Sequence, residues 1–170
     1  MNFQHHLSYL LMIVLFTIST NTYALENDRE KPVHISADTV TINEKTGIST
    51  YIGNVKISQG SMILTGEKVT VYQPDGKLDN IIVTGSPAQF KQLSDINNQE
   101  ITATAKELKY QTIDEKLILT GEASLKQGQN SFTGHKIEYD TRNSTVTANT
   151  DSDKKQRVNA IITPKQKDKN

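Results

Sequence analysis

The 170-residue sequence contains no cysteine and no tryptophan, and aromatic residues make up only 6% of it. The lack of cysteine excludes disulfide bonds, thiolate metal sites, cysteine nucleophiles and a lipid-modified N-terminal cysteine. Lysine plus arginine equals aspartate plus glutamate at 19 each, so the chain has no surplus of positive charge. Proteins that bind nucleic acid usually show such a surplus, and we therefore expect no nucleic-acid partner.

Motifs that carry chemistry are also missing. The sequence contains no G-x-S-x-G, H-E-x-x-H or P-loop pattern. His34 and His135 each stand alone between strand residues, which favours a surface or edge position over a metal site. Carboxylates are plentiful but fall mostly at turns or outward strand positions, although two glycosidase carboxylates distant in the sequence stay open as an alternative. We expect no enzyme, no cofactor and no metal.

The N-terminal region differs from the rest of the chain. An apolar run over 7–18 is shorter than the about 20 residues that span a bilayer, and Thr22 and Ala24 fit a signal-peptidase site. Every Lys, Arg, Asp and Glu follows Ala24. We predict export to the periplasm with cleavage near Ala24, and an uncleaved anchor is the alternative. The predicted organisation is a signal peptide at 1–24, one domain at 25–163 and a polar, disordered tail at 164–170.

The mature part shows alternation of apolar and polar residues rather than helical periodicity. The alternating pairs include Val40 and Ile42, Val55 and Ile57, Ile81 and Val83, and Leu117 and Leu119. Turn signals such as Pro74-Asp75-Gly76 separate these runs. Short alternating runs between close turns predict an antiparallel all-β domain.

The chain also repeats itself. Residues 51–72 align without a gap to residues 119–140 at an offset of 68, with Gln59 matching Gln127 and Gly66 matching Gly134. Within this repeat, a shorter unit of apolar and small residues occurs four times. Its small residues are Ala37, Gly66, Ala105 and Gly134, which lie 29, 39 and 29 positions apart.

In each unit, a step of three replaces the step of two directly after the small residue. A straight strand would then turn its apolar face outward. A bulge or sharp bend at the small residue restores the inward face, so we predict a bend at each of the four. Stacked strand–bend–strand–turn units make a jellyroll-like or flattened barrel. A plain β-sandwich with a filled core is the alternative.

The order and spacing of several segments resemble the periplasmic lipopolysaccharide-transport protein A family, also called OstA-like. The segments are Pro32-Val33-His34-Ile35-Ser36-Ala37-Asp38, Tyr51-Ile52-Gly53-Asn54-Val55, Gly85-Ser86-Pro87-Ala88-Gln89-Phe90, Leu119-Thr120-Gly121-Glu122-Ala123 and Lys155-Gln156-Arg157-Val158. The resemblance spans essentially the whole mature chain. It implies a twisted antiparallel β-jellyroll whose interior holds the acyl chains of lipopolysaccharide.

The resemblance also implies residues and partners. The positions that match the lipid contacts of the family are Val33, Ile35, Ile42, Phe90, Tyr110 and Leu119, and all lie on the apolar face that the repeat defines. Each is an ordinary core residue under the alternative interpretation. The implied partners are lipopolysaccharide with its lipid A, an inner-membrane transporter complex at the N-terminal edge, an outer-membrane insertion complex at the C-terminal edge, and further copies of the chain docked head to tail.

Two other functions stay open at this point. One is the membrane-anchored sister component of the same pathway, which shares the fold. The other is a structural or adhesive envelope protein, or a hydrolase, that uses the repeat as a scaffold. For head-to-tail docking, we expect free edges at a first strand near Val33 and a last strand over 158–162.

Overall fold

The computed structural model describes residues 28–94, 99–150 and 157–164, which form one antiparallel sheet of ten strands. The strands are β1 (His34–Ser36), β2 (Thr39–Asn43), β3 (Ile48–Gln59), β4 (Met62–Tyr72), β5 (Asn80–Leu93), β6 (Glu100–Gln111), β7 (Lys116–Gln127), β8 (Asn130–Asp140), β9 (Thr145–Asn149) and β10 (Asn159–Ile161), with 3₁₀ turns η1 (Asp28–Glu30) and η2 (Pro74–Gly76). The predicted all-β antiparallel class is confirmed. The described segments include no helix long and apolar enough to cross a bilayer. The predicted signal peptide and residues 165–170 of the predicted tail lie outside the described residues.

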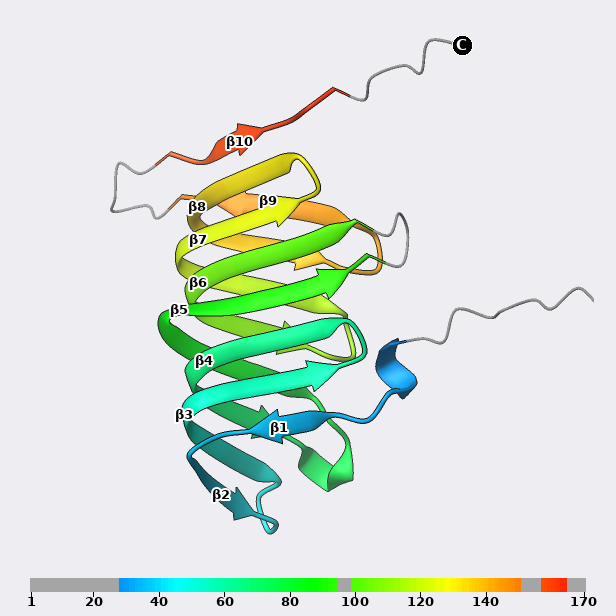
Figure 1. Ribbon diagram of the computed structural model, residues 1–170, viewed down its shortest axis with the longest axis vertical. Helices are drawn as coiled ribbons and strands as arrows, with labels where there is room; N and C mark the ends of the chain where they lie inside the picture. The colour runs from blue at the N-terminus through cyan, green and yellow to red at the C-terminus, as the bar shows by residue number, and fades with distance from the viewer. Residues whose placement is uncertain (1–27, 95–98, 151–156, 165–170) are drawn as a thin grey trace, which may run out of the picture.

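The strands stack in sequence order along the long axis of the molecule (Figure 1). At one end, β1 and β2 both pair with β3, each along a different half of that strand. At the other end, β9 and β10 both pair with β8 in the same manner. In the described part of the chain, the sheet therefore ends in two pairs of edge strands and does not close into a barrel.

The sheet is folded lengthwise into two layers. Each long strand pair shifts register near its middle, at 52–55 on β3, 65–68 on β4, 84–88 on β5, 104–107 on β6 and 120–123 on β7. A strand bends at its shift and continues in the facing layer (Figure 1). We call the line of bends the spine. Layer one holds β1, β10 and the strand halves 55–59, 62–65, 88–93, 100–104, 123–127 and 130–134; layer two holds β2, β9 and the remaining halves.

The small residues of the repeat lie at these bends, which confirms the predicted positions. Ala37 separates β1 from β2, and Gly66, Ala105 and Gly134 lie beside the register shifts. A Cβ atom on Gly66 would lie 2.5 Å from Cγ1 of Val83 and 2.7 Å from the carbonyl oxygen of Thr84. Real Cβ atoms do not approach other atoms this closely, so only glycine lets the two strands meet at this bend.

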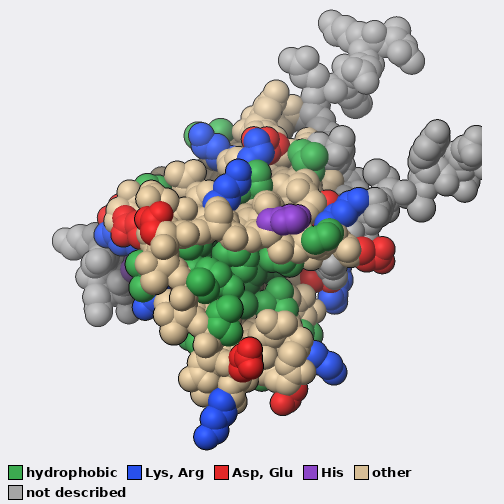
Figure 2. Space-filling model, turned by 60° about the horizontal axis from the view of Figure 1, so that its bottom comes forward, with side chains coloured by type: hydrophobic (Ala, Val, Ile, Leu, Met, Phe, Trp, Pro, Cys, Tyr) green, Lys and Arg blue, Asp and Glu red, His purple; other side chains and the backbone are tan. Residues whose placement is uncertain are grey.

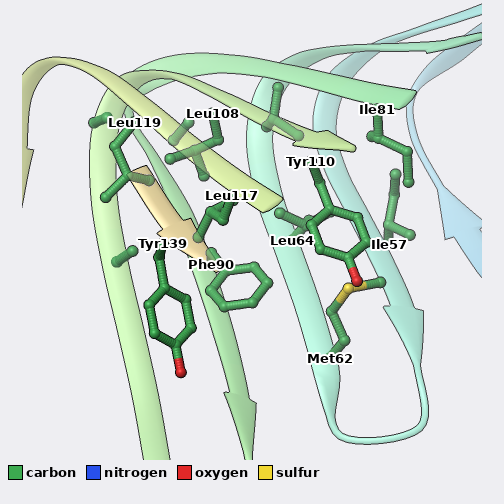
Figure 3. Close-up of a cluster of buried hydrophobic side chains, with 14 of the residues drawn as sticks. Ile57, Met62, Leu64, Ile81, Phe90, Leu108, Tyr110, Leu117, Leu119 and Tyr139 are labelled. Atoms are coloured by element: carbon green, nitrogen blue, oxygen red, sulfur yellow. The ribbon is translucent and has the colours of Figure 1, made fainter. Parts of the chain in front are cut away.

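The hydrophobic core lies between the layers. Leu64, Leu108 and Leu119 are 0% exposed, and burying one such side chain contributes about 1.5–3 kcal/mol. Phe90 of layer one and Tyr110 of layer two stack across the interior, with ring centroids 6.4 Å apart and planes inclined by 30° (Figure 3). Side chains from both layers therefore fill the space between them.

Candidate functional site

Inward-facing side chains form continuous rows along the long axis, because paired strands place residues of the same parity side by side. The middle row of layer one holds Ile35, Ile57, Leu64, Phe90, Ala103, Leu125 and Phe132. The middle row of layer two holds Val40, Tyr51, Val69, Val83, Leu108, Leu119, Ile137 and Ala148. Two facing apolar rows therefore extend from the first strands to the last.

At the β1/β2 end, these rows reach the surface. Val33, Val40 and Ile42 are 41%, 52% and 60% exposed, and Ile35 is half-buried against the core. We call these four residues the N-terminal mouth. Figure 2, which views this end, shows apolar side chains between the two layers. The apolar interior is thus open to solvent here.

Five of the six residues implied by the resemblance lie on inward rows, and the sixth, Val33, directly precedes β1. The six lie in two environments. Phe90, Tyr110 and Leu119 are buried in the middle of the molecule, where Phe90 stacks on Tyr110. Val33, Ile35 and Ile42 lie together at the N-terminal mouth. The first three residues are packed among core side chains, so a ligand that reached them would have to separate the layers.

The free edge of each layer, opposite the spine, consists of hairpin turns, and we call it the lip. On layer two, successive turns are joined by backbone hydrogen bonds. The amide of Gln73 donates to the Gly47 carbonyl at 2.7 Å, and the amide of Thr112 donates to the Asp79 carbonyl at 2.9 Å. The amide of Thr141 donates to the Glu115 carbonyl at 2.9 Å. These bonds continue the sheet ladder through the turns and stiffen this lip.

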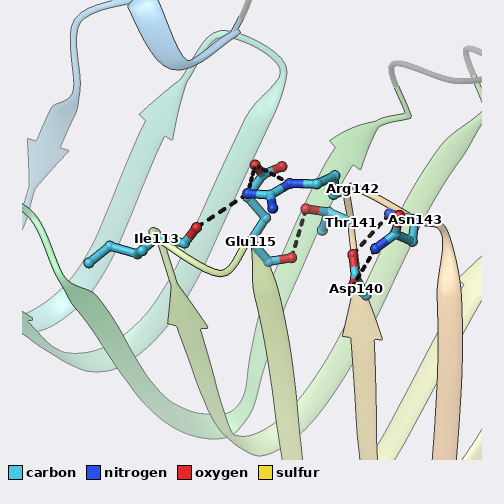
Figure 4. A network of polar contacts seen from close by, with 6 residues as sticks. All are labelled: Ile113, Glu115, Asp140, Thr141, Arg142 and Asn143. Carbon is cyan, nitrogen blue, oxygen red and sulfur yellow. Dashed lines mark hydrogen bonds and ion pairs between the residues drawn. The ribbon is translucent and has the colours of Figure 1, made fainter.

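The last of these joints carries an ion pair (Figure 4). Nε and Nη2 of Arg142 donate to Oε1 of Glu115 at 2.9 and 2.6 Å, and Nη2 also donates to the Ile113 carbonyl at 3.3 Å. The Glu115 side chain is 7% exposed and that of Arg142 is 58% exposed. Beside it, hydrogen bonds from the backbone amide and side chain of Asn143 hold the pKa of Asp140 below its usual range. This cluster fixes the β8–β9 turn to the β6–β7 turn.

Sequence reasoning missed three polar groups in the interior. Oε1 of Gln92 and the hydroxyl oxygens of Tyr139 and Ser144 are buried and have no hydrogen-bond partner among the described residues. Burial raises the pKa of Tyr139, and the nearby Ser144 hydroxyl offsets part of this rise without reaching hydrogen-bond geometry. Buried polar atoms in folded proteins are nearly always partnered, so these positions call for an explanation.

Other surface features do not suit an apolar ligand. A hollow of about 570 Å³ lies at the spine, and its lining includes Glu67, Lys106 and Glu122. These charges disfavour acyl chains there, because an apolar ligand would remove them from water. Among the described residues, no cluster of histidine and carboxylate side chains is arranged to hold a metal ion.

Comparison with known proteins points to one family. Residues 34–145 match the family model described as LptA/(LptD N-terminal domain) LPS transport protein. The chain is 31% identical over 155 residues to the lipopolysaccharide export system protein LptH of Pseudomonas aeruginosa, covering 88% of this chain and 89% of that protein. It is 30% identical over 167 residues to the lipopolysaccharide export system protein LptA of Escherichia coli, covering 96% and 89%.

The fold agrees with this match. The crystal structure of LptH from Pseudomonas aeruginosa, described as the LptA homologous periplasmic component of the conserved lipopolysaccharide transport device, superimposes with a TM-score of 0.75. The match has 30% sequence identity and covers 82% of this chain and all of the LptH chain. The predicted jellyroll-like twisted sheet is thereby confirmed.

Proposed function

Because this chain belongs to the LptA/LptD N-terminal-domain family of lipopolysaccharide transport proteins, we propose that it carries lipopolysaccharide across the periplasm with the acyl chains held between its two layers. The observation that carries this proposal is the pair of apolar rows that runs the length of the molecule and opens at the N-terminal mouth. The relatives are named as transport components rather than enzymes. The proposed role needs no catalytic group.

The binding energy comes from hydrophobic burial. Each methylene that leaves water contributes about 0.8 kcal/mol, so a lipid with several chains gains affinity without any polar contact. Entry at the N-terminal mouth requires little rearrangement, because Val40 and Ile42 are already exposed. Movement past Phe90 and Tyr110 requires the two rings to separate, and acyl chains then replace the contacts that the rings lose.

Site-specific photo-crosslinking tests the position of the lipid. Crosslinkers at Val33, Ile35, Ile42, Phe90, Tyr110 and Leu119 should capture lipopolysaccharide. Crosslinkers at the matched outward positions Thr41 and Lys109, each next to an inward residue on the same strand, should not capture it. Equal capture at inward and outward positions would refute binding between the layers.

The proposal extends to assembly. The edge strands β1 and β2 at one end, and β9 and β10 at the other, offer unpaired backbone groups to which a further strand can add. Contact between unlike ends produces an open, head-to-tail chain of copies that aligns their interiors. The same ends would dock an inner-membrane transporter complex at β1/β2 and an outer-membrane insertion complex at β9/β10, so that a bridge connects the membranes.

Truncation tests the assembly. Removal of residues from Val158 onward deletes β10, which pairs with β8 at only three positions. The fold should therefore survive, while oligomers seen by light scattering over a concentration series should disappear. Removal of residues 165–170 alone serves as the control and should leave the oligomers unchanged. A full-length protein that stays monomeric at high concentration and does not bind a peptide of its own first strand would contradict the bridge.

Localisation is tested separately. We propose that residues 1–24 are removed on export and that 25–163 is the single functional domain, followed by a short polar tail. Intact-mass measurement of exported protein should find a species that begins near Leu25 in the periplasmic fraction. A membrane-bound species that retains Met1 would instead indicate the anchored sister component.

A further inference from the structure

One inward row does not follow the apolar pattern of the others. At the lip of layer one, Gln59 pairs with Met62, and Gln92 and Gln127 flank Ile101 on β6. The last inward residue of β3, β5 and β7 is therefore a glutamine. The antiparallel strands between them, β4 and β6, contribute the apolar residues Met62 and Ile101 to the same row. We call Gln59, Gln92 and Gln127 the amide row. Because neighbouring strands lie about 4.8 Å apart, successive amides are spaced by about 10 Å along the axis.

The middle residue of the amide row, Gln92, has a buried side-chain oxygen that lowers the stability of the fold. Gln92 is half-buried, its neighbour Ile101 is 1% exposed, and Oε1 of Gln92 is buried without a hydrogen-bond partner. An unpaired buried acceptor lowers stability, whereas leucine in its place would only add apolar contacts. The position therefore keeps an acceptor oxygen that the described residues do not use.

The facing lip carries matching hydroxyl groups. In layer two, Tyr110 and Tyr139 flank Leu117 on the inward lip row, so they are separated by the same two-strand step as Gln92 and Gln127. Tyr110 stacks on Phe90, which lies two residues before Gln92 on β5, so the lip row of layer two lies across the interior from the strand that carries Gln92. Tyr139 is 0% exposed, and its hydroxyl has no hydrogen-bond partner in the part of the chain that the structure describes.

Gln59 shows what kind of group the amides bind. Its Nε2 donates to the backbone carbonyl oxygen of Lys31 at 3.1 Å, where the segment that follows η1 lies over the lip of layer one. The amide row therefore accommodates a carbonyl acceptor from outside the sheet. Ester and amide linkages present the same acceptor, and hydroxyl groups beside them supply donors for the glutamine oxygens.

We propose that Gln92 and Gln127 of the amide row, together with Tyr139, bind the linkage region of an acylated sugar, where ester and amide carbonyls and hydroxyl groups join the acyl chains to the headgroup. This inference rests on the proposed function, and it adds a polar subsite to the apolar one. The chains lie against the middle rows, and the linkages lie at the lip. Gln92 and Gln127 offer the lipid two hydrogen-bonding positions along the axis, and the third position of the row, Gln59, already bonds the Lys31 carbonyl.

Two probes separate this subsite from simple hydrophobic binding. Lipid A carries ester and amide linkages, whereas lauric acid carries only a chain and a terminal carboxylate. The Gln92→Leu/Gln127→Leu variant should bind lipid A about tenfold more weakly, since each lost hydrogen bond accounts for a factor of about 2–10, and should bind lauric acid as the wild type does. Gln89→Leu, at an exposed outward position on β5, is the matched control and should bind both probes normally.

Stability of the unliganded protein gives a second measurement. Gln92→Leu removes the unpaired acceptor, so its melting temperature should equal or exceed that of the wild type while its affinity for lipid A falls. A lower melting temperature with unchanged lipid A affinity would overturn the proposal and assign Gln92 a structural role. A wild type that binds lipid A, with variants that bind it equally well, would refute the amide row alone. A wild type that binds neither probe would refute the proposed function and the amide row together.

Discussion

The two ends of the sheet are built from the same repeated unit but present different surfaces. At the β1/β2 end, Val40 and Ile42 are 52% and 60% exposed. At the β9/β10 end, Ile137 and Tyr139 occupy the equivalent positions of the last unit and are both 0% exposed. The difference arises because β9 covers one end of these inward rows, whereas nothing among the described residues covers β2.

This contrast shows that the position of a residue in the repeat does not by itself determine whether its side chain is buried. Equivalent positions in the repeat are buried in the core where strands lie on both sides and are exposed where the sheet stops. Exposed apolar groups of this size mark interaction sites in soluble proteins. At the other end, Ile161 and Ile162 are also 65% and 70% exposed, but Ile161 pairs with Ser131 on the outward face and does not extend an inward row. Most of the apolar surface available for further burial along the inward rows is therefore at the β1/β2 end. Substitutions in the buried part of these rows should cost the most folding free energy.

The largest expected difference between the ends is in packing. Leu119→Ala should lower the free energy of unfolding by about 2–5 kcal/mol, because it leaves a cavity in the middle row of layer two. Val40→Ala, at the open end of the same row, should change it by at most about 0.5 kcal/mol. Urea unfolding followed by circular dichroism measures both, and equal losses would contradict the open mouth.

A smaller effect is expected from the joint at the covered end. Arg142→Met removes both guanidinium hydrogen bonds to the buried Glu115 carboxylate. Because Arg142 is largely exposed, the free energy of unfolding should fall by only about 1–3 kcal/mol. Lys106→Met is the control, since the side chains of the Lys106–Glu122 pair are 66% and 72% exposed. Its loss should not exceed about 0.5 kcal/mol. Thermal unfolding of both variants at one pH provides the comparison.

Near the open end, hydrogen bonds of Asp28 attach the N-terminal segment to the β3–β4 turn, and their loss should cost less than the loss of the Arg142–Glu115 pair. The Asp28 carboxylate accepts hydrogen bonds from the Ser61 amide at 2.9 Å and from the Ser61 hydroxyl, and the Ser61 oxygen accepts one from the Leu93 amide at 3.1 Å. Asp28→Ala should cost about 0.5–1.5 kcal/mol. It should accelerate hydrogen exchange at Leu93 and leave Thr141 in the far turn unchanged. Equal acceleration at both amides would indicate global rather than local loosening.

The smallest effect concerns Tyr139 and appears only at high pH. Burial raises its pKa in the folded protein above the unfolded value of 10.0. The folded state therefore holds its proton more tightly, and stability is lost as the pH rises from the unfolded pKa through the folded pKa. Tyr139→Phe should be at least as stable as the wild type at neutral pH and should unfold at a higher pH in an alkaline titration. An unchanged alkaline midpoint would exclude Tyr139 as the titrating group.

The sequence predicts the bends well because their cause is local. A small residue followed by a shifted alternation is readable at Gly66 and Gly134, and the structure bends at both. It does not predict the exposure of Val40 and Ile42, since this depends on which strands end the sheet. The predicted strand over 158–162 is nearly correct, but β10 covers only Asn159–Ile161, and its pairing with β8 depends on contacts far apart in the chain.

For the candidate site, too, the sequence predicts the local feature, which face a residue lies on, but not its burial. Five of the six predicted residues face inward, because parity fixes the face once the bends are known, and the sixth, Val33, lies just before the first paired residue of β1. Parity alone does not distinguish the packed Leu119 from the exposed Ile42, and the lipid contacts of all six remain a prediction. The sequence match of Gln59 with Gln127 was the one available signal for the amide row. This match does not reveal a row by itself, because Gln92 lies outside the aligned repeat. Only the strand pairing places Gln92 beside Gln127, on the two sides of Ile101.

The spine gives the protein mechanical properties that differ with direction. Backbone hydrogen bonds join strand to strand along the axis, so stretching the molecule in that direction breaks ladders. Across the axis, the layers are joined by the bends and by side-chain packing such as that of Phe90 on Tyr110. Splaying the layers exposes apolar surface, and acyl chains inserted as proposed above would bury that surface again. The protein is therefore stiff along its length and compliant across its width.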